Sequence, residues 1–88
     1  MMRHAKVFAA LGDETRLQLM ARLRDEGPTS ITKLAEEFPI TRQAITKHLR
    51  VMEDAGVVHS VSRGRETLWS LSARWDARLA RLKSLIEG

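Results

Sequence analysis

The apolar residues before position 56 recur at spacings of three and four, which is the periodicity of amphipathic helices. Glycine or proline follows each of the first three apolar stretches and interrupts the pattern. Asp13 and Thr41 can cap the second and fourth helices, and either Thr29 or Ser30 can cap the third. The pattern therefore predicts four helices, at 2–11, at 14–25, from about 31 to 38 and from about 42 to 55.

After the fourth helix the period of the hydrophobic pattern changes to two. Residues 57–62 and 66–71 are rich in β-branched and aromatic side chains, and Gly64 lies between them, where a tight hairpin needs a positive φ. Residues 73–87 return to helical spacing. The sequence therefore predicts one mainly helical domain over residues 1–88 with a small β-hairpin, in the order four helices, hairpin, helix.

The third and fourth predicted helices, with a tight break between them, have the layout of a helix-turn-helix unit. In the fourth helix Ile45 and Leu49 form the apolar face, and the opposite face carries only side chains that can donate hydrogen bonds. Arginine can bond to guanine, glutamine can pair with adenine, and lysine and threonine can contact bases or phosphates. A merely solvated helix face is the alternative, but such a face usually mixes acidic with basic residues. We therefore expect this face to bind double-stranded DNA, through Arg42, Gln43, Thr46, Lys47 and Arg50.

The tip of the expected hairpin adds two guanidinium groups, those of Arg63 and Arg65. Arginine–glycine turns are common and carry little information by themselves. A basic hairpin directly after a candidate recognition helix, however, has the place of a wing, from which arginine can reach flanking phosphates or a narrow minor groove. Arg63 and Arg65 are therefore also expected to contact DNA.

The net charge of +4 lies entirely in the second half of the chain. Residues 1–40 hold six basic and six acidic residues, whereas residues 41–88 hold nine basic and five acidic ones. This asymmetry favours a polyanionic partner, although a mild excess of arginine also serves solubility.

The 88 residues contain no cysteine and three histidines. The lack of thiols excludes disulfide scaffolds, thiolate metal sites and cysteine nucleophiles. His4, His48 and His59 do not form a pair at chelating spacing, and the chain has neither a glycine-rich phosphate loop nor a nucleophile motif. We therefore expect no metal, no other cofactor and no enzymatic activity. The apolar runs are too short to span a membrane, which favours a cytoplasmic location.

A monomer of this length buries only about 60% of its unfolded surface, so we expect oligomerisation to complete its core. The last helix carries an apolar row at spacings of four, three and four, and the first helix carries a second apolar group. Such rows can cover the core of their own chain, which is the usual role of an amphipathic helix, or they can form a two-fold seam. The residues expected at a homodimer interface are Val7, Phe8, Leu11, Trp75, Leu79, Leu82 and Ile86.

Three segments of the stretch from Phe8 to Leu71 resemble the ArsR/SmtB-type winged-helix repressors of bacteria. They are FAALGDETRLQLMARL near the start, TRQAITKHLRVMEDAGVVHS across the fourth helix and RGRETLWSL in the hairpin. The resemblance implies a homodimeric transcriptional repressor that binds an operator of two inverted half-sites and releases it on a signal. It also implies that base and phosphate contacts fall on Arg42, Gln43, Thr46 and Lys47.

Two features separate the sequence from the metal-sensing members of that family. Ser30 and Thr32 stand at the positions that match a thiolate pair, and the last helix holds Asp76 and Glu87 but no histidine. The sequence therefore looks closer to the branch that does not sense metals, in which a small organic inducer or a partner protein supplies the signal. The alternative function is an architectural or protein-interaction module of the same fold, without operator specificity.

Overall fold

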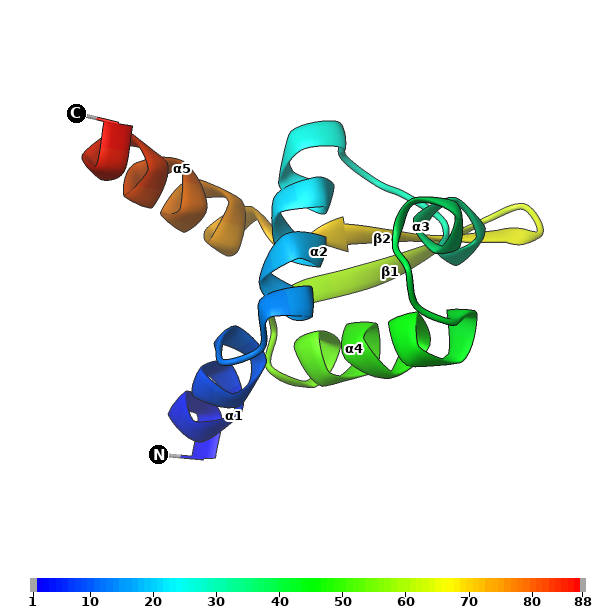
Figure 1. Cartoon of the computed structure of the whole chain (residues 1–88), viewed down its shortest axis with the longest axis horizontal. Helices are drawn as coiled ribbons and strands as arrows, with labels where there is room; N and C mark the ends of the chain where they lie inside the picture. Colours follow the sequence, from blue (N-terminus) through cyan, green and yellow to red (C-terminus); the bar gives the residue numbers. More distant parts are fainter. Residues whose placement is uncertain (1, 88) are drawn as a thin grey trace.

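The computed structural model describes residues 2–87, without the side chains of residues 2–5, 8, 79, 82, 83, 86 and 87. Its elements confirm the predicted order of four helices, a hairpin and a helix, with boundaries within one residue of those expected. None of the helices in this range has the length and apolar composition that a membrane span requires. The elements in Figure 1 are α1 (Met2–Leu11), α2 (Glu14–Glu26), α3 (Ile31–Glu37), α4 (Arg42–Asp54), β1 (Val58–Arg63), β2 (Glu66–Leu71) and α5 (Ala73–Glu87).

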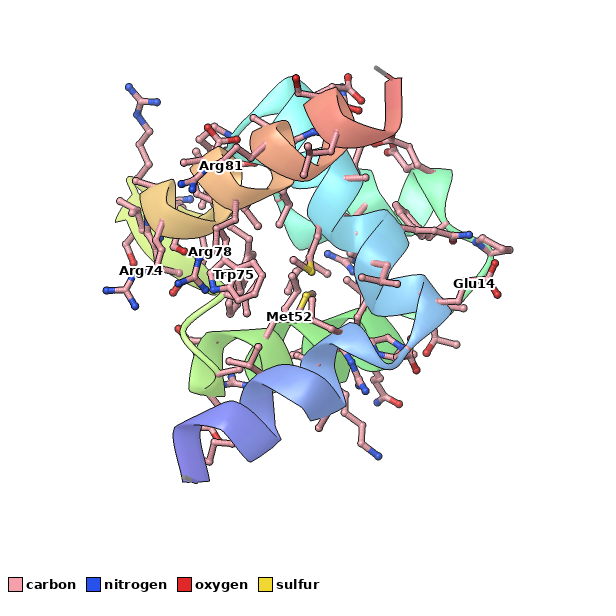
Figure 2. All side chains as sticks on the ribbon, turned by 90° about the vertical axis from the view of Figure 1, so that its left-hand side faces the viewer. Glu14, Met52, Arg74, Trp75, Arg78 and Arg81 are labelled. Carbon is pink, nitrogen blue, oxygen red and sulfur yellow. The ribbon has the colours of Figure 1, made fainter. Side chains whose placement is uncertain are left out.

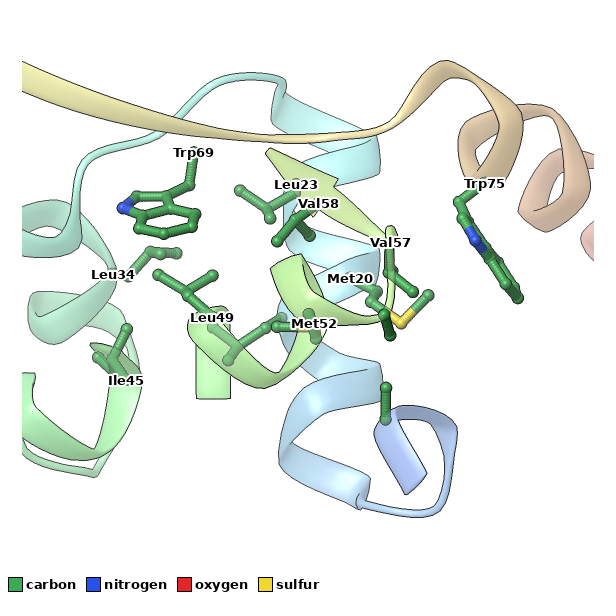
Figure 3. Close-up of a cluster of buried hydrophobic side chains, with 13 residues drawn as sticks. Met20, Leu23, Leu34, Ile45, Leu49, Met52, Val57, Val58, Trp69 and Trp75 are labelled. Atoms are coloured by element: carbon green, nitrogen blue, oxygen red, sulfur yellow. The ribbon is translucent and has the colours of Figure 1, made fainter. Parts of the chain in front are cut away.

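The core lies between α2, α3, α4 and the base of the hairpin (Figure 3). Three apolar side chains of α2 and three of α4 lie in it, and each of the six is at most 2% exposed. Because burial of one stripe leaves the rest of a helix surface outside, the polar residues of α4 face solvent. The six buried residues are Leu19, Met20, Leu23, Ile45, Leu49 and Met52.

Polar side chains set the N-termini of α2, α3 and α4. Asp13, Ser30 and Thr41 each accept a hydrogen bond from the backbone N–H three residues later, at 3.0, 3.2 and 3.1 Å. Ser30 rather than Thr29 therefore caps α3. Thr29 pairs with Trp69 instead: each backbone N–H donates to the other residue's carbonyl, at 3.0 and 2.9 Å, which adds a short third segment beside β2.

The hairpin is antiparallel, and Arg63 opposite Glu66 is its outermost pair. The loop is therefore Gly64–Arg65, and Gly64 has a φ of 65°, as the sequence predicts for a tight turn. The base of the hairpin packs on the core, whereas the outer residues of both strands are exposed. In Figure 1 the outer part projects beyond the helices.

α1 and α5 project from the same side of the molecule, where both chain ends lie (Figure 1). Val7 and Leu11 of α1 are half-buried against the core of their own chain. On α5, Leu85 is 79% exposed. The other apolar side chains expected at a dimer interface lie outside the described residues, and these are Phe8, Leu79, Leu82 and Ile86.

Trp75, which the sequence also predicts at a dimer interface, packs in the core of its own chain. It is only 8% exposed and belongs to the core of its own chain, at one end of the cluster beyond Met20 and Val57 (Figure 3). Figure 2 shows the ring on the inner side of α5, next to Arg78. The guanidinium of Arg78 lies over the ring, 5.1 Å from its centroid, which is a cation–π arrangement. Little of the ring therefore remains uncovered.

Candidate nucleic-acid interface

α3 and α4 form a helix-turn-helix unit that is fastened to α2. Leu34 of α3 is completely buried. At the end of α3, Glu37 accepts two hydrogen bonds from the Arg22 guanidinium, from Nε at 2.9 Å and from Nη2 at 2.8 Å. Arg22, whose side chain is 10% exposed, also donates to Oγ1 of Thr29 at 3.2 Å. These contacts fix the position of α3, and the helical periodicity of α2 did not reveal the role of Arg22.

The outer face of α4 carries the polar residues that the sequence predicts for DNA binding. Gln43, Lys47 and Arg50 are exposed, and together with the half-buried Thr46 they line an open hollow along the helix. Between residues 42 and 50, all of which the structure describes, no carboxylate interrupts this face. Two acidic residues line only its far end. An exposed helix with such donors has the shape and chemistry to enter the major groove.

Arg63 and Arg65 are both exposed at the tip of the hairpin. Figure 1 shows this tip beyond the N-terminal end of α4, which is the end from which a recognition helix contacts base edges. Arg63 lies opposite Glu66, whereas Arg65 occupies the loop itself. The loop guanidinium therefore lies at the outer end of the hairpin, where the sequence predicts a contact with the DNA backbone.

Comparison with known proteins finds the same arrangement. A helix-turn-helix domain family matches residues 11–61, which is more than half of the chain. An ArsR-like transcriptional regulator from Rhodococcus sp. RHA1 is 37% identical, with a TM-score of 0.76 over 98% of this chain and 92% of that chain. The chain belongs to the ArsR family. It is therefore a DNA-binding transcriptional regulator with a winged helix-turn-helix fold.

Two further matches are a sequence relative and a solved structure of the same fold. The arsenical resistance operon repressor of Bacillus subtilis (strain 168) is 29% identical over 70 residues, which are 80% of this chain and 67% of that protein. A homodimeric winged helix-turn-helix DNA-binding domain from Mycobacterium bovis has a TM-score of 0.82 over 97% of this chain and 78% of its own, at 21% identity. At that identity the likeness concerns the fold alone.

In this ArsR-family protein the Thr46 hydroxyl is already used as a donor. Its Oγ1 donates to the backbone carbonyl of Arg42, one turn earlier, at 2.9 Å. A hydroxyl has one proton and two acceptor lone pairs. Thr46 therefore keeps an acceptor and a methyl group for a partner, and these would suit an amino group of adenine or cytosine, or the methyl group of thymine.

His48 lies on the side of α4 that faces the junction of α1 and α2. It is half-buried, and Nη1 of Arg16 donates to its Nδ1 at 3.4 Å. The same guanidinium donates to two carbonyls in the last turn of α1, those of Ala9 at 2.9 Å and Ala10 at 3.2 Å. Arg16 therefore joins α1, α2 and α4. Sequence reasoning missed this junction because His48 is 32 residues away along the chain, and because helical periodicity does not reveal side-chain hydrogen bonds to the carbonyls of α1.

The hydroxyls at the positions that match the metal-binding thiolates have other partners. Ser30 caps α3, and Oγ1 of Thr32 accepts a hydrogen bond from Nη2 of Arg42 at 2.6 Å. Neutral hydroxyls also lack the softness that thiolate-type sites use to select metals. Within the described part of the chain, no three His, Asp or Glu side chains come together as a metal site would require.

The attachment of α3 to α2 is expected to depend on pH through Glu37. The hydrogen bonds from Arg22 lower the pKa of the Glu37 carboxyl below its usual value of 4.5. A carboxyl whose pKa is depressed in the folded state stabilises the fold above its unfolded pKa, and this contribution is lost as the pH falls through the folded pKa. The difference in free energy of unfolding between wild type and Glu37→Gln should therefore be largest near neutral pH and shrink below pH 4.5.

Urea unfolding followed by circular dichroism between about pH 3 and pH 7 measures this difference. Glu36→Gln, at the exposed neighbouring position, is the matched control and should show a smaller dependence. A wild-type advantage over Glu37→Gln that is the same at both ends of this range would contradict the role of the Arg22–Glu37 pair.

Proposed function

We propose that this ArsR-family protein represses transcription as a homodimer bound to an operator of two inverted half-sites. The observation that carries the proposal is the outer face of α4, on which cationic and amide donors extend from Arg42 to Arg50 without a carboxylate. The relative named as an operon repressor supports repression as the direction of control. The proposal includes a cytoplasmic location and action by binding alone, without catalysis.

Dimerisation would supply the sequence specificity that one copy lacks. A single recognition helix reads about four base pairs, and two helices spaced by about 34 Å double this number along one face of the duplex. The placement of α1 and α5 on one side supports a seam there, as does the exposed Leu85. The Mycobacterium bovis domain that shares the fold is homodimeric. The proposed seam therefore comprises Val7, Phe8, Leu11, Leu79, Leu82, Leu85 and Ile86.

We further propose that the releasing signal is a small organic ligand or a partner protein. The chain has no cysteine, and the hydroxyls of Ser30 and Thr32 are engaged within the DNA-binding unit. Release of operator by micromolar zinc, reversed by a chelator, would overturn this part of the proposal.

Arg42→Ala and Gln43→Ala are each expected to weaken operator binding by about 1–3 kcal/mol and to relax the base preference at one position of each half-site. The reason is that both residues begin the exposed face of α4, the end that contacts bases. Fluorescence anisotropy measures the affinity for an operator duplex selected from a randomised library, and for a scrambled duplex of equal length.

Arg24→Ala, on α2, is the matched control for the loss of one arginine. Equal losses on the two duplexes would show that Arg42 and Gln43 contact only phosphates. A wild-type protein that binds both duplexes alike would support the architectural function instead, because a repressor needs a specificity ratio on the order of 10³ or more.

Arg65→Ala is expected to weaken binding to every duplex alike and to lower the slope of log affinity against log salt by about 1 per subunit. The exposed loop guanidinium contacts a phosphate in this proposal, so its loss leaves one fewer counterion to release. Affinities measured at several salt concentrations give the slope. Arg74→Ala removes an equal charge from α5 and should leave the slope nearly unchanged; identical slopes for both variants would mean that the wing points away from DNA.

A further inference from the structure

Thr32 and Arg42 form a hydrogen bond that crosses the turn of the helix-turn-helix unit. Nη2 of Arg42 donates to Oγ1 of Thr32, and the two atoms are 2.6 Å apart. The donor is charged, which makes the bond stronger than one between neutral groups. Both residues are exposed. The bond therefore lies on the surface of the unit and takes no part in packing the core.

The acceptor is held firmly on its own helix. Ser30 caps the first turn of α3, Leu34 is completely buried, and Glu37 is bound by two hydrogen bonds from Arg22. Thr32 lies between these fixed points. Its hydroxyl is thus a fixed acceptor on α3. It lies near the start of α4, from which the long Arg42 side chain extends.

The bond restricts the guanidinium while leaving most of its donors free. A guanidinium has five N–H donors, and Thr32 occupies one of them. An arginine that is already restricted loses less rotamer freedom when it binds DNA, so more of the contact energy appears as affinity. The alternative is that the bond holds the Arg42 guanidinium away from DNA. The exposure of both side chains and the free N–H donors of Arg42 favour the first interpretation, in which the bond orients the guanidinium toward DNA.

We propose that Thr32 is a positioning residue, which orients the Arg42 guanidinium for base contact and does not touch DNA itself. The proposal rests on the DNA contact of Arg42 proposed above. It assigns a function in DNA recognition to α3, at the family position where metal-sensing members carry a thiolate.

The test compares Thr32→Val, which keeps the side-chain shape and removes the acceptor, with Thr32→Ser, which keeps the hydroxyl. Thr32→Val should weaken binding to the library-selected operator duplex by about three- to tenfold, with a smaller effect on the scrambled duplex. Thr32→Ser should stay within about twofold of wild type. Thermal unfolding of both variants should match that of the wild type, because a surface hydrogen bond contributes little to the stability of the core.

A double-mutant cycle with Arg42→Ala isolates the coupling. In the Arg42→Ala background, Thr32→Val should cause no further loss, since its partner is gone. Three outcomes would overturn the positioning role and leave the Arg42 contact in place. Thr32→Val could cause equal losses in both backgrounds, or it could tighten operator binding. It could also have no effect while Arg42→Ala weakens binding. If Arg42→Ala itself leaves operator binding unchanged, the proposed contact fails and the positioning role fails with it.

Discussion

Leu85→Asp is expected to convert the proposed dimer into monomers whose operator binding is weaker by roughly 10²- to 10⁴-fold. Leu85 is 79% exposed on α5, so it has little cover from its own chain. In a two-fold seam each residue is used twice, and the substitution therefore brings two carboxylates into one interface, where unpaired charges are costly. The loss of affinity follows because a monomer binds one half-site without the gain of linking two sites, which amounts to roughly 10²- to 10⁴-fold.

Sedimentation velocity and operator titration measure the two effects, and circular dichroism checks that the fold persists. Ser84→Asp is the matched control, because Ser84 is exposed and helical spacing places it away from the apolar row of α5. We expect this control to remain dimeric. A Leu85→Asp protein that still sediments as a dimer would place the seam on another surface.

Trp75→Ala, on the same helix, is expected to act on folding rather than on assembly. The ring is 8% exposed and lies in the core of its own chain. Truncation of a buried tryptophan costs about 3–5 kcal/mol through lost burial and the cavity left behind. A small domain has a total stability of about 5–15 kcal/mol, so the substitution removes a large fraction of it and the variant should unfold at a markedly lower temperature than the wild type.

Thermal and urea unfolding test this expectation. Trp75→Phe is the control, since phenylalanine refills part of the space and should cost less. The opposite result, a Trp75→Ala protein with wild-type thermal stability that sediments as a monomer, would return Trp75 to the dimer interface that the sequence suggests.

Local signals in the sequence were sufficient for the elements, because caps and turns depend on neighbouring residues. Asp13 and Thr41 cap the helices predicted for them, and Gly64 forms the tight turn. Periodicity also separated the buried and exposed faces of α4. It does not show which surface covers an apolar residue, and for this reason it does not distinguish Trp75, which packs on the core of its own chain, from the exposed Leu85.

The long-range polar contacts could not be predicted for a related reason. Arg16, Arg22 and Thr32 have the composition of ordinary surface positions, and their roles arise only when the fold brings distant partners within hydrogen-bond distance. Ser30 and Thr29 were indistinguishable as caps until the backbone pairing of Thr29 with β2 separated them.

The junction at Arg16 also connects the helix of the proposed seam, α1, to the candidate DNA-binding helix, α4. Its guanidinium links the last turn of α1 to His48 in the middle of α4, so a displacement of α1 would be passed to α4 through these contacts. In the proposed dimer, the orientation of the two chains at the seam would therefore set the distance between the two α4 helices. A ligand that changes only the angle between the two chains would alter the distance between the α4 helices. The protein would then leave its operator, although each DNA-binding unit stays intact.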